Sequence, residues 1–132
     1  MTYKNLKSYL PVIIVGAVIF IVSHQSKIDA AYTFGLSDKL LHIGAYLIFG
    51  LALIWGMNKN HPDIKIERFF LIFLLIGSTF ALSDEVHQNF VAGRDSDFFD
   101  WLADNIGLII AFWIFKYLKQ RKIISKKSEN PL

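Results

Sequence analysis

Four long runs of apolar residues alternate with short polar stretches along the 132-residue chain. The runs cover about residues 6–23, 39–57, 69–90 and 101–118. Each is close to the roughly 17–25 residues that a helix needs to cross a bilayer. The pattern predicts an all-α integral membrane protein in which residues 1–118 form a four-helix bundle. Residues 119–132 are basic and polar, and we expect a frayed helix end followed by a disordered tail.

The third and fourth runs reach spanning length only if each includes polar residues at one end. The uninterrupted apolar part of the third run, Phe69–Leu82, is too short to cross unaided. Its last turns must therefore include Asp84, Glu85 and His87, and the first turns of the fourth helix must include Asp104. Ionisable side chains at membrane depth are costly unless they pair, reach water or bind a ligand. This polar cluster therefore indicates a functional site.

The positive residues are distributed unevenly between the two ends of the predicted helices. Eleven of the fourteen Lys and Arg residues lie in the N-terminal flank, in the stretch between the second and third runs, and in residues 116–127. The opposite side has only Lys27, Lys39 and Arg94. Because cytoplasmic flanks carry the excess of Lys and Arg, we expect both termini in the cytoplasm and the polar cluster facing outward.

Composition narrows the classes of function further. Hydrophobic residues make up 54% of the chain, and its formal net charge is +3. The positive residues form no basic face with interleaved aromatic residues, so we expect no nucleic-acid partner. There is no cysteine, which excludes disulfides, thiol nucleophiles and Cys-ligated zinc. The first run follows Lys4 and Lys7 like a signal peptide, but no small-x-small cleavage site follows it, so we interpret it as a retained span.

Helical spacing places several of the polar residues on common faces. Residues three and four apart share a face, which puts Asp84 beside His87 and Gln88, and His42 beside Tyr46. If the ends of the second, third and fourth helices meet, four side chains converge in one outward pocket. These four are our candidate catalytic residues: Asp84, His87, His42 and Asp104.

Structural roles remain open for the same residues. Ser96 or Asp97 can cap the fourth helix, and Asp100 suits its first turn because of the helix dipole. The histidines and Asp84 can simply form hydrogen bonds between helices. Glu85 faces a different direction from Asp84, which favours a contact with lipid headgroups.

The residue types suit a metal, but the sequence gives no metal signature. Histidine binds zinc, and carboxylates bind zinc, magnesium or calcium. No HExxH-type spacing is present, so we predict no metal ligands, and no cofactor can be named. Ser83 and Ser96 lack the strand–turn–helix setting of a serine nucleophile.

Two segments resemble the signature regions of VanZ-like membrane proteins: DKLLHIGAYLIFG at residues 38–50 and ALSDEVHQNFVAGRDSDFFDWLADNIG at residues 81–107. The chain departs from the pattern at residues 89–92, where family members often have a more proline-rich turn. The resemblance implies a small multi-pass protein of the bacterial cytoplasmic membrane, in a family named for teicoplanin resistance. Its motif positions fall on Asp38, Lys39, His42, Tyr46, Ser83, Asp84, Glu85, Gln88, Gly93, Arg94, Asp100, Asp104 and Asn105.

The resemblance and the polar cluster together lead to one expected function and two alternatives. We expect the outward pocket to bind or chemically alter an envelope lipid, a lipid-linked cell-wall precursor or a lipophilic glycopeptide. Whether a reaction is catalysed stays open, as does the oligomeric state. One alternative is a non-catalytic structural or interaction module, and a less favoured one is a proton-coupled transporter. The candidate binding residues are Arg94, Gln88, Asp38, Tyr46, Glu85, Asp100 and Asn105.

Overall fold

The computed structural model describes residues 5–24, 38–91 and 96–129, with side chains given as far as residue 121. In chain order its elements are η1 (Leu6–Tyr9), α1 (Leu10–Ser23), α3 (Asp38–Asn60), α4 (Ile66–Gln88) and α5 (Phe98–Glu129). No strand occurs within these ranges. Four of its helical segments are long and apolar enough to cross a membrane. The predicted all-helical fold with four spanning-length helices is therefore confirmed, and the orientation of the termini stays a prediction.

The helices begin where local chemistry favours a start. Pro11 lies in the first turn of α1, where its missing N–H has no partner in any helix. Asp97 directly precedes α5, and its Oδ1 accepts a hydrogen bond of 2.9 Å from the backbone N–H of Phe99. Asp97 is thus the N-cap of α5, in agreement with one of the two predicted caps.

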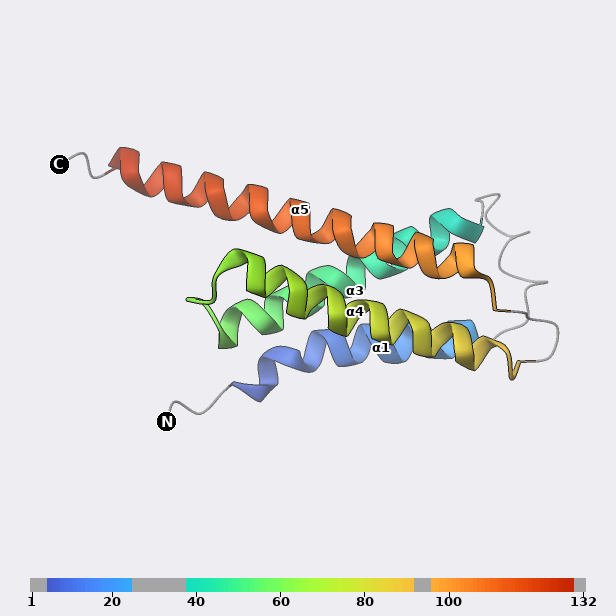
Figure 1. The fold of residues 1–132 in the computed structure, drawn as a ribbon. Helices are drawn as coiled ribbons and strands as arrows, with labels where there is room; N and C mark the ends of the chain where they lie inside the picture. Colours follow the sequence, from blue (N-terminus) through green and yellow to red (C-terminus); the bar gives the residue numbers. More distant parts are fainter. Residues whose placement is uncertain (1–4, 25–37, 92–95, 130–132) are drawn as a thin grey trace.

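The helices form a bundle in which α3 contacts every other element (Figure 1). The chain leaves the bundle at the same end at which it enters (Figure 1). Helices α3 and α5 run in the same direction and make the most extensive contact, while α1 and α4 run the opposite way. At one end of the bundle, therefore, α1 and α4 finish and α3 and α5 begin.

Small residues let α3 and α5 approach closely. A Cβ added at Gly107 would lie against the backbone of α3 at Ile43 and Leu47, and one added at Gly50 would lie 2.8 Å from the Cβ of Ala111. Gly107 and Ala111, two small residues four positions apart, are both buried in this contact. Away from it the core is rich in aromatic rings, such as Phe49 and Phe80, which stack with centroids 4.5 Å apart.

The structure extends the C-terminal helix beyond its predicted limit. We expected the chain to fray after residue 118, but α5 continues to Glu129. Lys, Arg, Gln and Glu are good helix formers, so a segment too polar to be buried can still continue a helix that has already formed. Helix α4, which corresponds to the third apolar run, ends at Gln88, and Asp84, Glu85 and His87 lie in its last turns as predicted.

Candidate functional site

A buried polar cluster occupies the end of the bundle where α1 and α4 finish and α3 and α5 begin. Five of its side chains are no more than 4% exposed: Asp84, Glu85, Gln88, Asp100 and Asp104. They come from two helices, and α3 adds Lys39, His42 and Tyr46. Carboxylates are rarely buried so completely without partners, so their contacts decide what the cluster can do.

A ladder of ion pairs joins α3 to α5. The Nζ of Lys39 pairs with Asp97 at 2.6 Å and also with Asp100. One turn further in, Nδ1 of His42 lies 2.9 Å from Oδ1 of Asp104. Lys39 and Asp100 are 61 positions apart in sequence, and His42 and Asp104 are 62 apart, because α3 and α5 are parallel and stay in register. The pairing of His42 with Asp104 agrees with the predicted convergence of these side chains.

A second set of contacts joins α1 to α4. The hydroxyl of Ser23 donates to Oδ2 of Asp84 at 2.8 Å, and the amide of Gln88 donates to the same oxygen at 3.3 Å. Sequence reasoning did not include Ser23. The only signal for it was a hydroxyl at the last position of an otherwise apolar run.

Glu85 lies inside the cluster, which corrects the suggestion that it reaches lipid headgroups. Its side chain is 4% exposed, and Oε2 accepts a hydrogen bond of 3.0 Å from the backbone N–H of Asp97. Ser96 and Asp97, just before α5, lie against the end of α4, where the N–H of Ser96 also donates to Oδ1 of Asn89 at 3.0 Å. A helical face considered alone cannot show such a contact.

Four buried oxygen atoms in the cluster have no hydrogen-bond partner among the described residues. They are the Tyr46 hydroxyl, Oδ1 of Asp84, Oε1 of Glu85 and Oδ2 of Asp104. Buried polar atoms in proteins are nearly always paired, so a group of unpaired oxygens at one place points to a missing ligand or solvent.

A cavity of about 170 Å³ borders the cluster. Asp38, His42 and Tyr46 of α3 and Asp84 of α4 supply its polar wall, and residues of α1 supply most of its apolar wall. Among the latter, Val18 and Val22 are about half exposed on the outer surface of the bundle. The cavity therefore lies between the polar cluster and the surface that lipid would cover.

Other predicted site residues lie outside this arrangement. The His87 ring stacks on Phe20, with centroids 4.0 Å apart, and its Nε2 lies 3.3 Å from Nδ1 of His24. The Asn105 amide donates to the carbonyl of Trp101 in its own helix. Gly93 and Arg94 lie outside the described residues, so the predicted role of Arg94 stays a prediction.

The arrangement provides two kinds of chemistry. Asp104 can hold the His42 ring in one orientation and stabilise its charged form, which is what a general base needs. Two groups also have the spacing of metal ligands: His42, Glu85 and Asp104 form one, and Asp38, His42 and Asp100 form the other.

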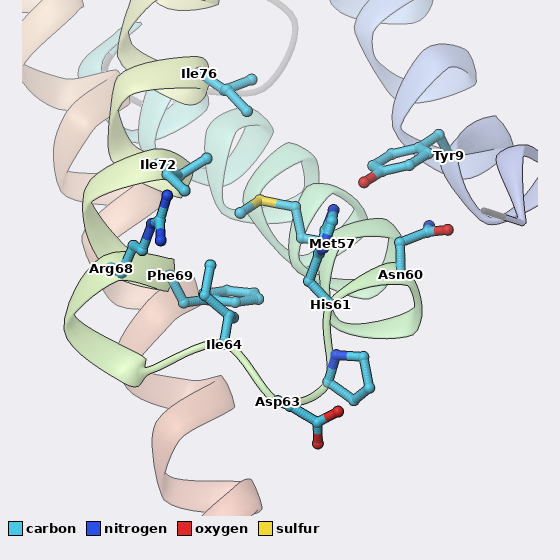
Figure 2. Close-up of a pocket in the computed structure, with 11 residues that line it drawn as sticks. Tyr9, Met57, Asn60, His61, Asp63, Ile64, Arg68, Phe69, Ile72 and Ile76 are labelled. Carbon is cyan, nitrogen blue, oxygen red and sulfur yellow. The ribbon is translucent and has the colours of Figure 1, made fainter. Parts of the chain in front are cut away.

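A larger hollow of about 600 Å³ lies at the opposite end of the bundle. Tyr9 lies on one side of it, and Arg68, Ile72 and Ile76 of α4 lie on the other (Figure 2). Its wall also includes Asn60, whose Oδ1 is buried without a partner among the described residues. Sequence reasoning predicted no site here.

Comparison with known proteins places the chain in a family. Neither the curated proteins nor the solved structures gave a match. The model of the VanZ/LLP1 family matches residues 8–120, which cover nearly all of the four spanning-length segments, from Ser8 in the first to Gln120 in the fourth. The resemblance of residues 38–50 and 81–107 thus extends over most of the sequence, and the chain belongs to the VanZ/LLP1 family.

Proposed function

We propose that the polar cluster binds the headgroup of an amphiphilic molecule of the cell envelope, either a lipid or a lipid-linked cell-wall precursor. The observation that carries this proposal is a pair of buried oxygens without a partner among the described residues, the Tyr46 hydroxyl and Oδ1 of Asp84, on residues that line a cavity with an apolar wall. An amphiphile provides both a polar group for the buried oxygens and an apolar chain for the exposed apolar surface. Its polar group satisfies the oxygens, and its chain covers the exposed part of α1.

The unpartnered atoms restrict the chemistry of that headgroup. Of the two that face the cavity, Oδ1 of Asp84 is a carboxylate oxygen, which accepts hydrogen bonds and donates none when ionised. The ligand must therefore bring donors, such as sugar hydroxyls, amide N–H groups or an ammonium group. A sugar- or peptide-bearing lipid, or a lipidated glycopeptide such as teicoplanin, meets this requirement better than a lipid with a bare phosphate.

If the bound molecule reacts, His42 is the group best placed to move a proton. Asp104 holds Nδ1 at 2.9 Å, and the other ring nitrogen, Nε2, lies 3.9 Å from Asp100. A histidine held in this way can accept a proton from a hydroxyl or a water molecule while the neighbouring carboxylate stabilises the imidazolium. Asp84 lines the same cavity and can position the substrate.

The proposal includes a location and an orientation, with both termini in the cytoplasm of a bacterium and the polar cluster at the outer face of its cytoplasmic membrane. The chain has no cysteine, so single introduced cysteines report cleanly on each side. Asp63→Cys should react with an impermeant maleimide only after the cell is opened. Phe90→Cys, at a side chain 83% exposed, should react in intact cells. The reverse pattern would invert the orientation.

A structural role is the second candidate, and the contacts between helices favour it. Lys39 and His42 join α3 to α5, and the Ser23–Asp84 hydrogen bond joins α1 to α4. A purely structural network, however, satisfies its buried atoms, whereas four oxygens of this one have no partner in the part of the chain that the structure describes.

Drug susceptibility separates the two candidates. A bacterial host would express the wild type, Asp104→Asn or Asp84→Asn at matched membrane levels, with Asp63→Asn as a control at the opposite end. We expect the wild type and the control to protect against teicoplanin more than against vancomycin, and the two cluster variants to give no protection. Equal protection by all four would make the cluster structural. If the wild type does not protect, the lipids that copurify with it and with Asp104→Asn would be compared by mass spectrometry, and identical lipids would reject the proposal.

A further inference from the structure

The polar cluster has more buried negative charge than the described residues balance. Four of its carboxyl groups are no more than 4% exposed, and they belong to Asp84, Glu85, Asp100 and Asp104. Lys39 pairs with Asp100 and with the half-buried Asp97. Of the remaining three buried acids, only Asp104 has a direct contact with a side chain that can be cationic, the imidazole of His42. A buried carboxylate without a compensating charge is strongly unfavourable, so these groups must either take up protons or bind a cation.

Three side chains of the cluster are spaced so that they can bind a positive ion. One ligand atom from each of His42, Glu85 and Asp104 lies within 4.8 Å of the other two. Ligands about 2.0–2.2 Å from one ion are themselves separated by roughly 3–4.4 Å. Small side-chain movements are enough to bring these atoms around one ion. We propose that His42, Glu85 and Asp104 form a binding site for a divalent transition-metal ion.

The unpartnered oxygens support this site independently of its spacing. Glu85 has a free Oε1 and Asp104 a free Oδ2, both buried and both without a partner among the described residues. Each residue uses its other oxygen to hold its own position, since Oε2 of Glu85 accepts from the backbone of Asp97 and Oδ1 of Asp104 contacts His42. In each carboxylate, one oxygen forms a contact that fixes the side chain, and the other oxygen is available to coordinate an ion. Carboxylate ligands of metals are commonly held in this way.

The alternative group of Asp38, His42 and Asp100 is less suitable. Asp100 is already paired with Lys39, whose charge would repel an ion at that place. Asp38 is half-buried and has access to water, so it does not need an ion for charge balance. The site therefore lies on the Glu85 side of His42.

The donor set indicates the class of metal. Imidazole nitrogen favours zinc, iron or similar ions over magnesium and calcium, and two carboxylates are common ligands of manganese and zinc. Three protein ligands leave coordination positions open, as in catalytic metal sites. An ion here would bind an oxygen of the headgroup, and the His42 nitrogen that holds the ion would then not accept a proton. That role rests on the proposed function, whereas the binding of the ion itself does not.

Metal content tests the site without any lipid or drug. The full chain, with its affinity tag removed, would be purified into nanodiscs, stripped with a chelator and dialysed against Mn²⁺ or Zn²⁺. We expect the wild type to retain one ion per chain, and Glu85→Gln and Asp104→Asn to bind it at least about tenfold more weakly. Asp63→Asn and His61→Asn, at the opposite end, should match the wild type. Absence of an ion from the wild type, or equal retention by the cluster variants, overturns the proposal.

Two further measurements show whether a loss of metal results from misfolding of a variant and whether the ion binds elsewhere in the protein. Electron spin echo spectra of Mn²⁺ bound to the wild type should show coupling to an imidazole nitrogen, and its absence counts against the site even if the variants do not fold. His24 and His87 form the nearest alternative ligands, since their ring nitrogens are 3.3 Å apart. An ion lost in His87→Asn but kept in Glu85→Gln would lie at that pair and would overturn the assignment.

Discussion

The two ends of the bundle treat charged side chains in opposite ways. At the end with the polar cluster, carboxylates are buried and contact Lys39, His42 and Ser23 on other helices. At the end with the larger hollow, cations stay near the surface of their own helices, as Lys59 does with its Nζ 4.9 Å from the ring centroid of Trp55. Charged residues therefore occur at both ends. A candidate site differs from an interfacial anchor because its charged side chains point into the bundle and contact other helices.

The largest effect should come from the close approach of α3 and α5 beside the cluster. Gly107→Ala places a methyl group against the backbone of Ile43 and Leu47, which cannot move without shifting the whole helix. We expect a loss of about 2–3 kcal/mol in the free energy of unfolding, together with loss of the His42–Asp104 contact. Thermal unfolding in detergent measures the stability.

Two other glycines serve as controls for that substitution. A Cβ at Gly44 meets no atom within 4 Å, so Gly44→Ala should be neutral or stabilise α3 by up to about 1 kcal/mol. Near the larger hollow, Gly56→Ala would meet mainly the Tyr9 ring, which can rotate away more easily than a backbone. If Gly107→Ala unfolds at the same temperature as Gly44→Ala, the two helices are less tightly packed than described.

Removing the cation of Lys39 from the polar cluster should have an intermediate effect on stability. Lys39→Met leaves the buried carboxylate of Asp100 without its partner, and we expect a loss of about 1–2 kcal/mol, limited by the partial exposure of Lys39. Arg68→Met is the matched change at the other end, where no ion pair within the described residues is broken, and it should change stability little. Chemical denaturation of both variants checks the difference. Equal losses would mean that the cluster pairs contribute no more than surface charges.

The smallest effect should come from one hydroxyl group. Ser23→Ala removes the 2.8 Å hydrogen bond to Oδ2 of Asp84. This oxygen then keeps only the longer hydrogen bond from Gln88 among the described residues. We expect a loss of about 1 kcal/mol. Ser83→Ala is the control, since its hydroxyl is exposed and, among the described residues, bonds only to the Phe80 carbonyl of its own helix. A difference of less than a few tenths of a kcal/mol between the two would exclude Ser23 from the cluster.

The sequence predicted most of the fold because bilayer thickness restricts it. A run of fourteen apolar residues cannot cross, so Asp84 and Glu85 had to belong to α4, and the structure places them there. The same argument put Asp104 inside α5, where it meets His42. Helix length was therefore a stronger guide to the cluster than any motif.

The details of the cluster depend on how the helices rotate against one another, and the sequence does not specify this. His87 shares a face with Asp84 in a helix taken alone, yet its ring turns toward Phe20 of α1. The sequence pattern favoured a headgroup contact for Glu85 because nothing in it showed that the backbone of Asp97 would donate to this carboxylate. The partner of Ser23 was equally hidden, since a single hydroxyl at the end of an apolar helix has no directional signal.

The contact at Gly107 also has a mechanical consequence. When a bilayer becomes thinner or thicker, packed helices respond by changing their tilt. Two rods held together at one place rotate about that place, so points close to it move least and the far ends move most. His42 and Asp104 lie one turn from the point where the backbones of Ile43 and Gly107 meet. We therefore expect their separation to stay nearly constant across membranes of different thickness, while the far ends of α3 and α5 change their separation most.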